Sequence, residues 1–100
     1  MDGFGFALTG GSAYLIHEKL TLQRRESLLK ELFLTNSTGI GLSYLRISIG
    51  ASDLDDHVFS YDDLPSGQED LNLTHFSLDE DQNHLIPVLK EIIALQPGIK

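Results

Sequence analysis

The sequence predicts an α/β fold in which two parallel strands are joined by a helical crossover. Residues 3–9 and residues 42–49 have strand-like patterns, and the 32 residues between them have apolar side chains at helical spacing. Parallel strands require a long crossover, whereas a hairpin needs only a few residues. With 100 residues, 41% of them hydrophobic, the chain is long enough for one small core.

The first strand is predicted at residues 3–9, where bulky and small side chains alternate. The two glycines at positions 10 and 11 are expected to end it. Helices are predicted over residues 12–35. Ser12 and Thr21 are their predicted N-caps, because a hydroxyl oxygen at that position can accept a hydrogen bond from an otherwise unpaired backbone N–H.

The second strand is predicted at residues 42–49, a segment dense in Leu and Ile. Arg46 lies inside it, and an arginine among apolar residues needs a carboxylate, an anion or water. Asp53 follows seven residues later. Parallel sheets bind ligands at the carboxyl ends of their strands, which favours a binding site there. A structural ion pair inside the core is the alternative.

Residues 50–76 are predicted to form a long acidic loop, and loops of this length are often functional. The sequence Ser77-Leu78-Asp79-Glu80 fits a capping box, so a helix is expected over residues 78–95. Pro87 is expected to bend this helix or to mark a break in it. The chain ends at Lys100, where a third strand would begin.

The charge distribution argues against several classes of partner. The net charge is −8, and residues 47–89 hold ten acidic side chains and no Lys or Arg. Coulomb repulsion makes nucleic acid and anionic membranes poor partners for such a segment. No membrane span is predicted, since no run approaches the roughly 20 apolar residues required. The first residues do not resemble a signal peptide, so either the chain is cytoplasmic or its true start is missing.

No cofactor or metal site is predicted from motifs. The glycines at positions 3 and 5 lack the third glycine of a dinucleotide fingerprint, because Leu8 occupies its place. The aspartate runs that begin at Asp53 and Asp79 lack the glycine and the glutamate of a calcium loop. The chain has no cysteine. Four histidines without metal-ligand spacing are interpreted as solvated or supporting side chains: His17, His57, His75 and His84.

Two segments, residues 2–13 (DGFGFALTGGSA) and residues 45–53 (LRISIGASD), together resemble the start of the catalytic domain of glycoside hydrolase family 30. This family contains glucosylceramidases and β-1,6-glucanases. Residues 61–62 and 76–78 also resemble it, so the resemblance covers essentially the whole chain. It implies a strand-helix-strand-helix portion of a (β/α)8 TIM barrel, incomplete in this chain, from an enzyme that hydrolyses β-glycosidic bonds with retention.

The resemblance also implies residue roles. Asp53 matches an aspartate that hydrogen-bonds hydroxyls of the sugar in the −1 subsite, and Arg46 matches an arginine that orders the catalytic centre. The family's two catalytic glutamates have no counterpart here, so no catalytic residue is assigned and this piece alone is expected to be inactive. No cofactor or metal is implied. The rest of the barrel is the expected packing partner, and the whole enzyme is expected to be secreted or periplasmic.

Two departures bear on the substrate. The pair Gly10-Gly11 resembles the bacterial branch of the family, and Leu54 stands where an aromatic residue is common. A β-1,6-glucan or another β-glucoside is therefore expected as readily as glucosylceramide. An alternative from another class is a stand-alone acidic α/β interaction module without catalytic activity, in which the acidic loop binds a basic partner and Arg46 forms a core ion pair.

Overall fold

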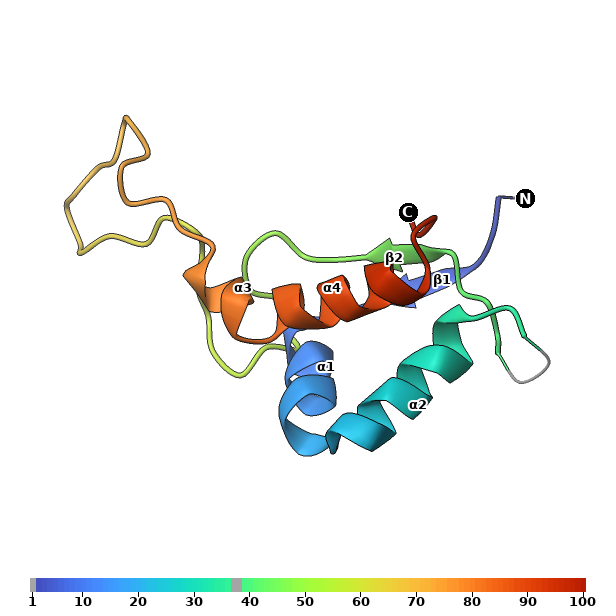
Figure 1. Ribbon diagram of the computed structural model, residues 1–100. Coiled ribbons are helices and arrows are strands. Elements are labelled where there is room, and N and C mark those ends of the chain that lie inside the picture. The colour runs from blue at the N-terminus through green and yellow to red at the C-terminus, as the bar shows by residue number, and fades with distance from the viewer. Residues whose placement is uncertain (1, 37–38) are drawn as a thin grey trace.

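A two-stranded parallel sheet is the frame of the fold. β1 (Gly5–Ala7) pairs with β2 (Tyr44–Arg46), so that Gly5 lies opposite Tyr44 and Ala7 lies opposite Arg46. The computed structural model describes residues 2–36 and 39–100, and its helices lie on one side of this sheet (Figure 1). The parallel pairing predicted from the long crossover is confirmed.

Both strands are shorter than the predicted segments 3–9 and 42–49. The last backbone bond between them runs from Leu8 N to Arg46 O, at 2.9 Å. Beyond it the first segment turns into a helix, and the second segment departs into the loop. A strand needs a hydrogen-bonding partner as well as an apolar pattern, so the alternation extends further than the ladder does.

The described residues of the crossover form three helical segments: α1 (Gly10–Tyr14), the π-helical turn η1 (Leu15–Lys19) and α2 (Leu22–Phe33). The predicted N-cap at Ser12 is wrong, because the Thr9 hydroxyl accepts from Ser12 N at 3.1 Å and the helix begins at Gly10. The two glycines are thus the first helical residues and do not merely end the strand. The cap at Thr21 is confirmed, with its hydroxyl accepting from Arg24 N at 3.3 Å.

The helix predicted over residues 78–95 is divided into α3 (Asp79–Asn83) and α4 (Leu85–Leu95). The break lies at His84, whose φ and ψ are −139° and −48°. Pro87 then stands in the first turn of α4, where a missing N–H leaves no intrahelical bond unmade. The expected break is therefore confirmed.

The capping box predicted at residues 77–80 does not form. Ser77 Oγ accepts from Asp79 N at 3.1 Å, one residue earlier than a capping box requires. The Glu80 carboxylate does not reach back to the helix start, because it lies 3.1 Å from His57 Nε2. A tertiary contact with the preceding loop replaces the local one.

The core lies between the sheet and the helices. Its buried side chains among the described residues come from the crossover and from α4, with one residue following β1: Leu8, Ala13, Leu29, Phe33, Leu85, Val88 and Ile92. Phe6 and Leu45, which are opposite each other in the sheet, pack against this core. The alternation of side chains across a strand therefore places Tyr44 and Arg46 on the sheet face that the helices do not cover.

A long segment without helix or strand connects β2 to α3, as predicted for residues 50–76. It extends away from the helices (Figure 1), and it explains a radius of gyration of 15.9 Å against about 13 Å for a compact domain of this length. Asp70 organises the far end, because its carboxylate accepts from Thr74 N at 2.9 Å and from His75 N at 2.7 Å. These backbone bonds lower the pKa of Asp70 to about 2.

The second edge of β2 is also paired. Lys100 N donates to Ser43 O at 2.9 Å, and Leu45 N donates to Lys100 O at 2.7 Å. This is the bonding pattern of a parallel ladder. Lys100 therefore occupies the position of a third strand next to β2. Among the described residues, no helix is long and apolar enough to cross a membrane.

Neighbouring isoleucines of α4 test this placement of the core. Ile92 is fully buried, whereas Ile93 is 51% exposed. Ile92→Ala is expected to lower the free energy of unfolding by about 2 to 5 kcal/mol, because it leaves a cavity between α4 and the crossover. Ile93→Ala, the matched control, is expected to cost under about 1 kcal/mol. Urea unfolding measures both, and equal losses would contradict the assigned orientation of α4.

Candidate functional site

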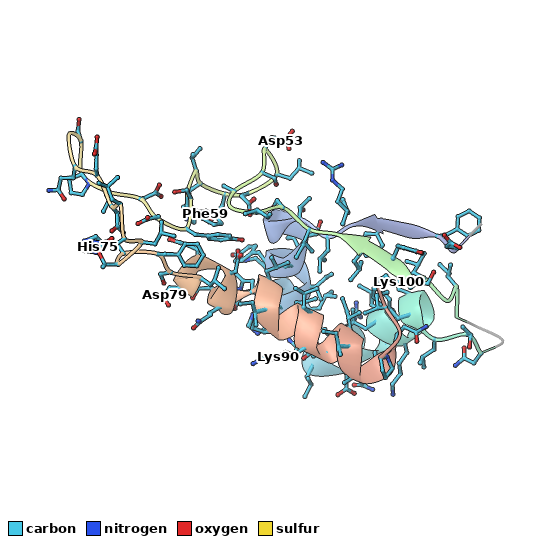
Figure 2. All side chains as sticks on the ribbon, turned by 90° about the horizontal axis from the view of Figure 1, so that it is seen from above. Asp53, Phe59, His75, Asp79, Lys90 and Lys100 are labelled. Atoms are coloured by element: carbon cyan, nitrogen blue, oxygen red, sulfur yellow. The ribbon has the colours of Figure 1, made fainter. Side chains whose placement is uncertain are left out.

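The two predicted binding residues line one hollow at the carboxyl end of the sheet. Arg46 is the last residue of β2, and Asp53 lies in the loop that follows. Together with Thr9 and Ser48 they border a space of about 220 Å³. Figure 2 shows Asp53 at the tip of its loop, on the side of the molecule away from α4.

Neither charged group is neutralised within the described part of the chain. Both residues are exposed, and neither side chain has a hydrogen bond or an ion pair with another described residue. Among the described residues Arg46 therefore forms no core ion pair. The reason is topological, because Arg46 lies on the sheet face opposite the helices and the buried residues. A guanidinium and a carboxylate are thus presented to solvent around one hollow.

The loop that carries Asp53 is closed by Asp55. Its carboxylate accepts from Ser52 N at 2.6 Å and from Ser52 Oγ at 3.0 Å, and Asp55 N donates to Ser52 O at 3.3 Å. This turn surrounds Asp53 and fixes the backbone on both sides of it. Sequence reasoning missed Asp55, although the Ser-x-x-Asp spacing is a turn signal that points to it.

Gly10 and Gly11 allow this turn to lie against the start of α1. A methyl group on Gly10 would overlap the Asp55 carboxylate, and one on Gly11 would overlap the Leu54 carbonyl oxygen. The absence of two side chains thus brings the loop to the helix. The glycine pair therefore helps to position Asp53. From the sequence alone, the pair is expected only to end the strand.

A second hollow of about 160 Å³ lies beside the first, between α1, the loop and α3. Four acidic residues are among those that line it: Asp55, Asp56, Glu80 and Asp81. The Tyr61 hydroxyl donates to the Asp81 carboxylate, and burial is the main cause that raises the pKa of this tyrosine. The hollow therefore carries more acidic than basic groups, and Phe59 of the loop also lines it.

His57 connects the loop to α3 through two carboxylates. Its Nδ1 lies 2.6 Å from Asp56 Oδ1, and its Nε2 lies 3.1 Å from Glu80 Oε2. The hydrogen bond to Asp56, followed by that to Glu80, raises the pKa of His57 above 6.5. The same bond lowers the pKa of Asp56. His57 thus links the loop to α3 through both of its ring nitrogens.

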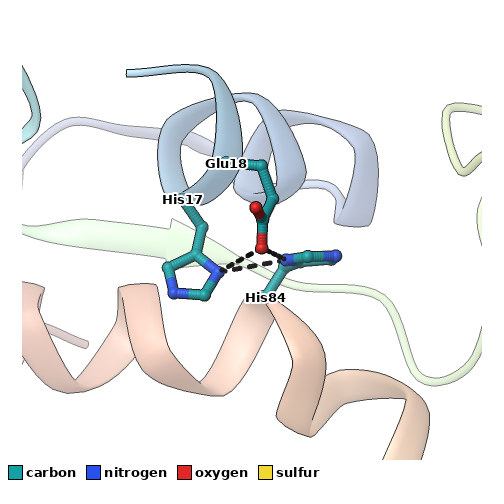
Figure 3. A group of neighbouring side chains, drawn as sticks. All are labelled: His17, Glu18 and His84. Carbon is teal, nitrogen blue, oxygen red and sulfur yellow. Dashed lines mark hydrogen bonds and ion pairs between the residues drawn. The ribbon is translucent and has the colours of Figure 1, made fainter. Parts of the chain in front are cut away.

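The fold also gathers two histidines that the sequence separates by 67 positions. His17 Nδ1 lies 3.1 Å from His84 Nδ1, and each of these atoms lies 3.5 Å from Glu18 Oε1 (Figure 3). Sequence reasoning missed this cluster, because no local spacing motif joins η1 to the break before α4. The interpretation of His17 and His84 as solvated or supporting side chains did not include their contact with each other.

Comparison with known proteins decides the family. The model of the glycosyl hydrolase family 30 TIM-barrel domain matches residues 1–100. The chain belongs to glycoside hydrolase family 30. This family 30 chain is 37% identical over 100 residues to an endo-1,6-beta-D-glucanase of Neurospora crassa, covering 99% of the chain and 20% of the relative. It is 31% identical over 91 residues to the putative glucosylceramidase 2 of Caenorhabditis elegans, covering 90% and 16%.

Solved structures place the family 30 chain in the same fold. The endo-beta1,6-glucanase BT3312 aligns with a TM-score of 0.83 at 37% identity, covering all of this chain and 20% of the other. SrfJ from Salmonella typhimurium aligns with a TM-score of 0.86 at 24% identity, with 100% and 21% coverage, and shows the fold alone. The chain thus spans about a fifth of its relatives, which fits an incomplete TIM barrel with two strands among the described residues.

The packing of the loop on the glycine pair gives a testable prediction. Gly11→Ala is expected to destabilise the chain by about 1 to 3 kcal/mol, because the new methyl group meets the backbone of Leu54 and the loop must shift. Gly98→Ala, where the nearest atom is 3.8 Å away, is the matched control and should change stability by under about 0.5 kcal/mol. Urea unfolding measures stability, and amide NMR shifts of residues 52–55 report the displacement. Unchanged shifts would refute the positioning role.

The contact of His57 predicts a pH dependence. Because its folded-state pKa is raised above 6.5, its stabilising effect is present below pH 6.5 and is lost as the pH rises through the folded-state value. NMR titration of the His57 ring should give a midpoint above 6.5, and Asp56→Asn should lower that midpoint. Glu69→Gln, which removes a loop carboxylate with no bond to His57, is the control and should leave it unchanged. A midpoint unaffected by Asp56→Asn would contradict the assignment.

Proposed function

We propose that this chain is the N-terminal part of a retaining glycosidase that cleaves β-glucosidic bonds, and that it supplies substrate-binding groups but no catalytic glutamate. The observation that carries the proposal is the convergence of Arg46 and Asp53 on one hollow at the carboxyl end of the sheet. In TIM barrels this end holds the active site, whereas the opposite end serves stability. Membership of family 30 supports the reaction class.

The two side chains have the chemistry that this role needs. The Asp53 carboxylate can accept hydrogen bonds from two sugar hydroxyls and so hold the ring in the distorted form that leads to the transition state. The Arg46 guanidinium offers several donors in a fixed plane, which suits the orientation of a neighbouring carboxylate. Neither group is bonded within the described chain, so both remain available for sugar and for the catalytic centre.

The proposal assigns the catalytic carboxylates to the rest of the barrel. Retention requires two carboxyl groups about 5 to 5.5 Å apart, one as nucleophile and one as acid and base. The glutamates of this chain lie on helices or in the loop: Glu18, Glu26, Glu31, Glu69, Glu80 and Glu91. None of them lines the hollow that Arg46 and Asp53 share.

A β-1,6-glucan is the proposed substrate. Two relatives at 37% identity are named for endo-β-1,6-glucanase activity, whereas the relative named as a glucosylceramidase is 31% identical. An uncharged glucan also avoids the Coulomb repulsion that the acidic loop would exert on anionic ligands. The chain's own residues thus contribute to holding a neutral sugar.

The remaining strands of the barrel are the proposed packing partner. The sheet face that the helices leave open carries Tyr44 and Arg46 beside the small Gly5 and Ala7, and it borders a shallow space of about 410 Å³. In a closed barrel, side chains from the other strands fill such a space. The pairing of Lys100 with β2 supports a third parallel strand at that edge.

Asp53→Asn in the enzyme expressed from the whole reading frame tests the proposal. We expect kcat/KM on β-1,6-linked glucose oligosaccharides to fall at least about 100-fold, since the loss of charged hydrogen bonds to two hydroxyls removes roughly 3 kcal/mol of transition-state stabilisation. Asp2→Asn is the matched control, because Asp2 precedes β1 at the opposite end of the sheet. Its kcat/KM should stay within about twofold of the unmodified enzyme.

Two outcomes would overturn the proposal. Unchanged kinetics of the Asp53→Asn enzyme, with the thermal unfolding profile preserved, would remove Asp53 from the substrate site. Full activity of the isolated 100-residue chain would show that the catalytic pair lies within it. Cleavage of glucosylceramide but not of β-1,6-linked oligosaccharides would refute the proposed substrate while retaining the reaction class.

A further inference from the structure

Three potential metal ligands meet where the crossover contacts the break between α3 and α4. His17 and Glu18 belong to η1, and His84 is the residue at the break. Their nearest ligand atoms are the Nδ1 atoms of both histidines and Oε1 of Glu18, all within 4.8 Å of one another. Figure 3 shows the three side chains directed toward a common point.

The distances among these atoms match the edges of a coordination tetrahedron. The three edges measure 3.1, 3.5 and 3.5 Å. Zinc binds imidazole nitrogen and carboxylate oxygen at about 2.0 to 2.1 Å, and in tetrahedral geometry this separates the donor atoms by about 3.3 Å. The side chains therefore need no large movement to hold an ion. We propose that His17, Glu18 and His84 form a zinc site, with the fourth position open to water.

The donor set favours zinc over the hard cations. Two imidazoles and one carboxylate are typical zinc ligands, whereas Ca²⁺ and Mg²⁺ select sites built from oxygen. The side chains of His17 and His84 are 28% and 29% exposed, and that of Glu18 is 49% exposed. An ion from solution can therefore reach the site.

Contacts around the cluster hold its members in place. An Arg25 guanidinium nitrogen donates to the His17 carbonyl oxygen at 3.1 Å, while Nε of the same arginine lies 3.0 Å from Glu91 Oε2 on α4. The rings of Tyr14 and His84 pack edge to face, with their centroids 5.0 Å apart. The π-helical turn η1 places His17 and Glu18 in adjacent positions with their ligand atoms on the same side. Such turns inside helices are frequent at functional sites.

The site would act as a clamp between segments distant in sequence. Bound zinc would join η1 to the junction of α3 and α4, and His84 also lines the acidic hollow beside the loop. Because the ion binds the folded arrangement of ligands, its binding free energy adds to stability.

Isothermal titration of the chain with ZnCl2 tests the proposal, with His17→Gln and His84→Gln as ligand variants. His75→Gln is the matched control, because His75 is an exposed loop histidine outside the cluster. We expect one zinc per chain, a thermal midpoint that rises with zinc and not with CaCl2, and an affinity at least about tenfold weaker in each ligand variant. The control should bind as the unmodified chain does.

Cobalt(II) reports the geometry independently. In the unmodified chain it should give the intense visible absorption of tetrahedral coordination, and Glu18→Gln should weaken that absorption. Because the Glu18 side chain is half exposed, Glu18→Gln should fold. The cobalt absorption can therefore be measured even if a histidine variant does not fold. Absence of zinc binding, equal affinity in the His84→Gln and His75→Gln chains, or an octahedral cobalt spectrum would each overturn the proposal. The first of these would leave a hydrogen bond between the two histidines as the role of the cluster.

Discussion

The parallel pairing of β1 with β2 is the constraint on which the rest of the structure depends. It brings the carboxyl ends of both strands to one edge, so that the start of α1 and the loop after β2 meet there. It also divides the side chains, since Phe6 and Leu45 pack on the helices while Tyr44 and Arg46 lie on the opposite face. The core thus lies against one face of this short ladder, and the candidate site lies at its carboxyl end.

Small residues make the close contacts around this ladder. Gly5 packs against the Tyr44 carbonyl within the sheet, and Gly10 and Gly11 allow the Asp53 loop to reach α1. The same contacts that stabilise the chain therefore position a residue of the candidate site. In a TIM barrel this coupling is general, because strand ends and their loops supply the site while helices supply the surrounding layer.

Sequence reasoning was most successful where the signal was local or covered a whole element. Apolar spacing placed the crossover, and the hydroxyl of Thr21 identified a cap. It failed at Ser12 and in the capping box, where neighbouring groups compete for the same N–H or carboxylate. The Thr9 hydroxyl caps α1 in place of Ser12, and the Glu80 carboxylate of α3 bonds to His57 of the loop. Propensity does not show which of several competitors is nearer.

The sequence by itself determined the α/β class, the family and the two residues proposed to bind sugar, because strand periodicity and the motif around Arg46 and Asp53 are contiguous. Only the tertiary structure decided that Arg46 lies on the sheet face away from the helices, since this depends on which face the helices cover. Only it joined His17 and Glu18 to His84, because chain folding across 67 positions sets that distance. Local patterns encode elements, whereas packing brings distant side chains together.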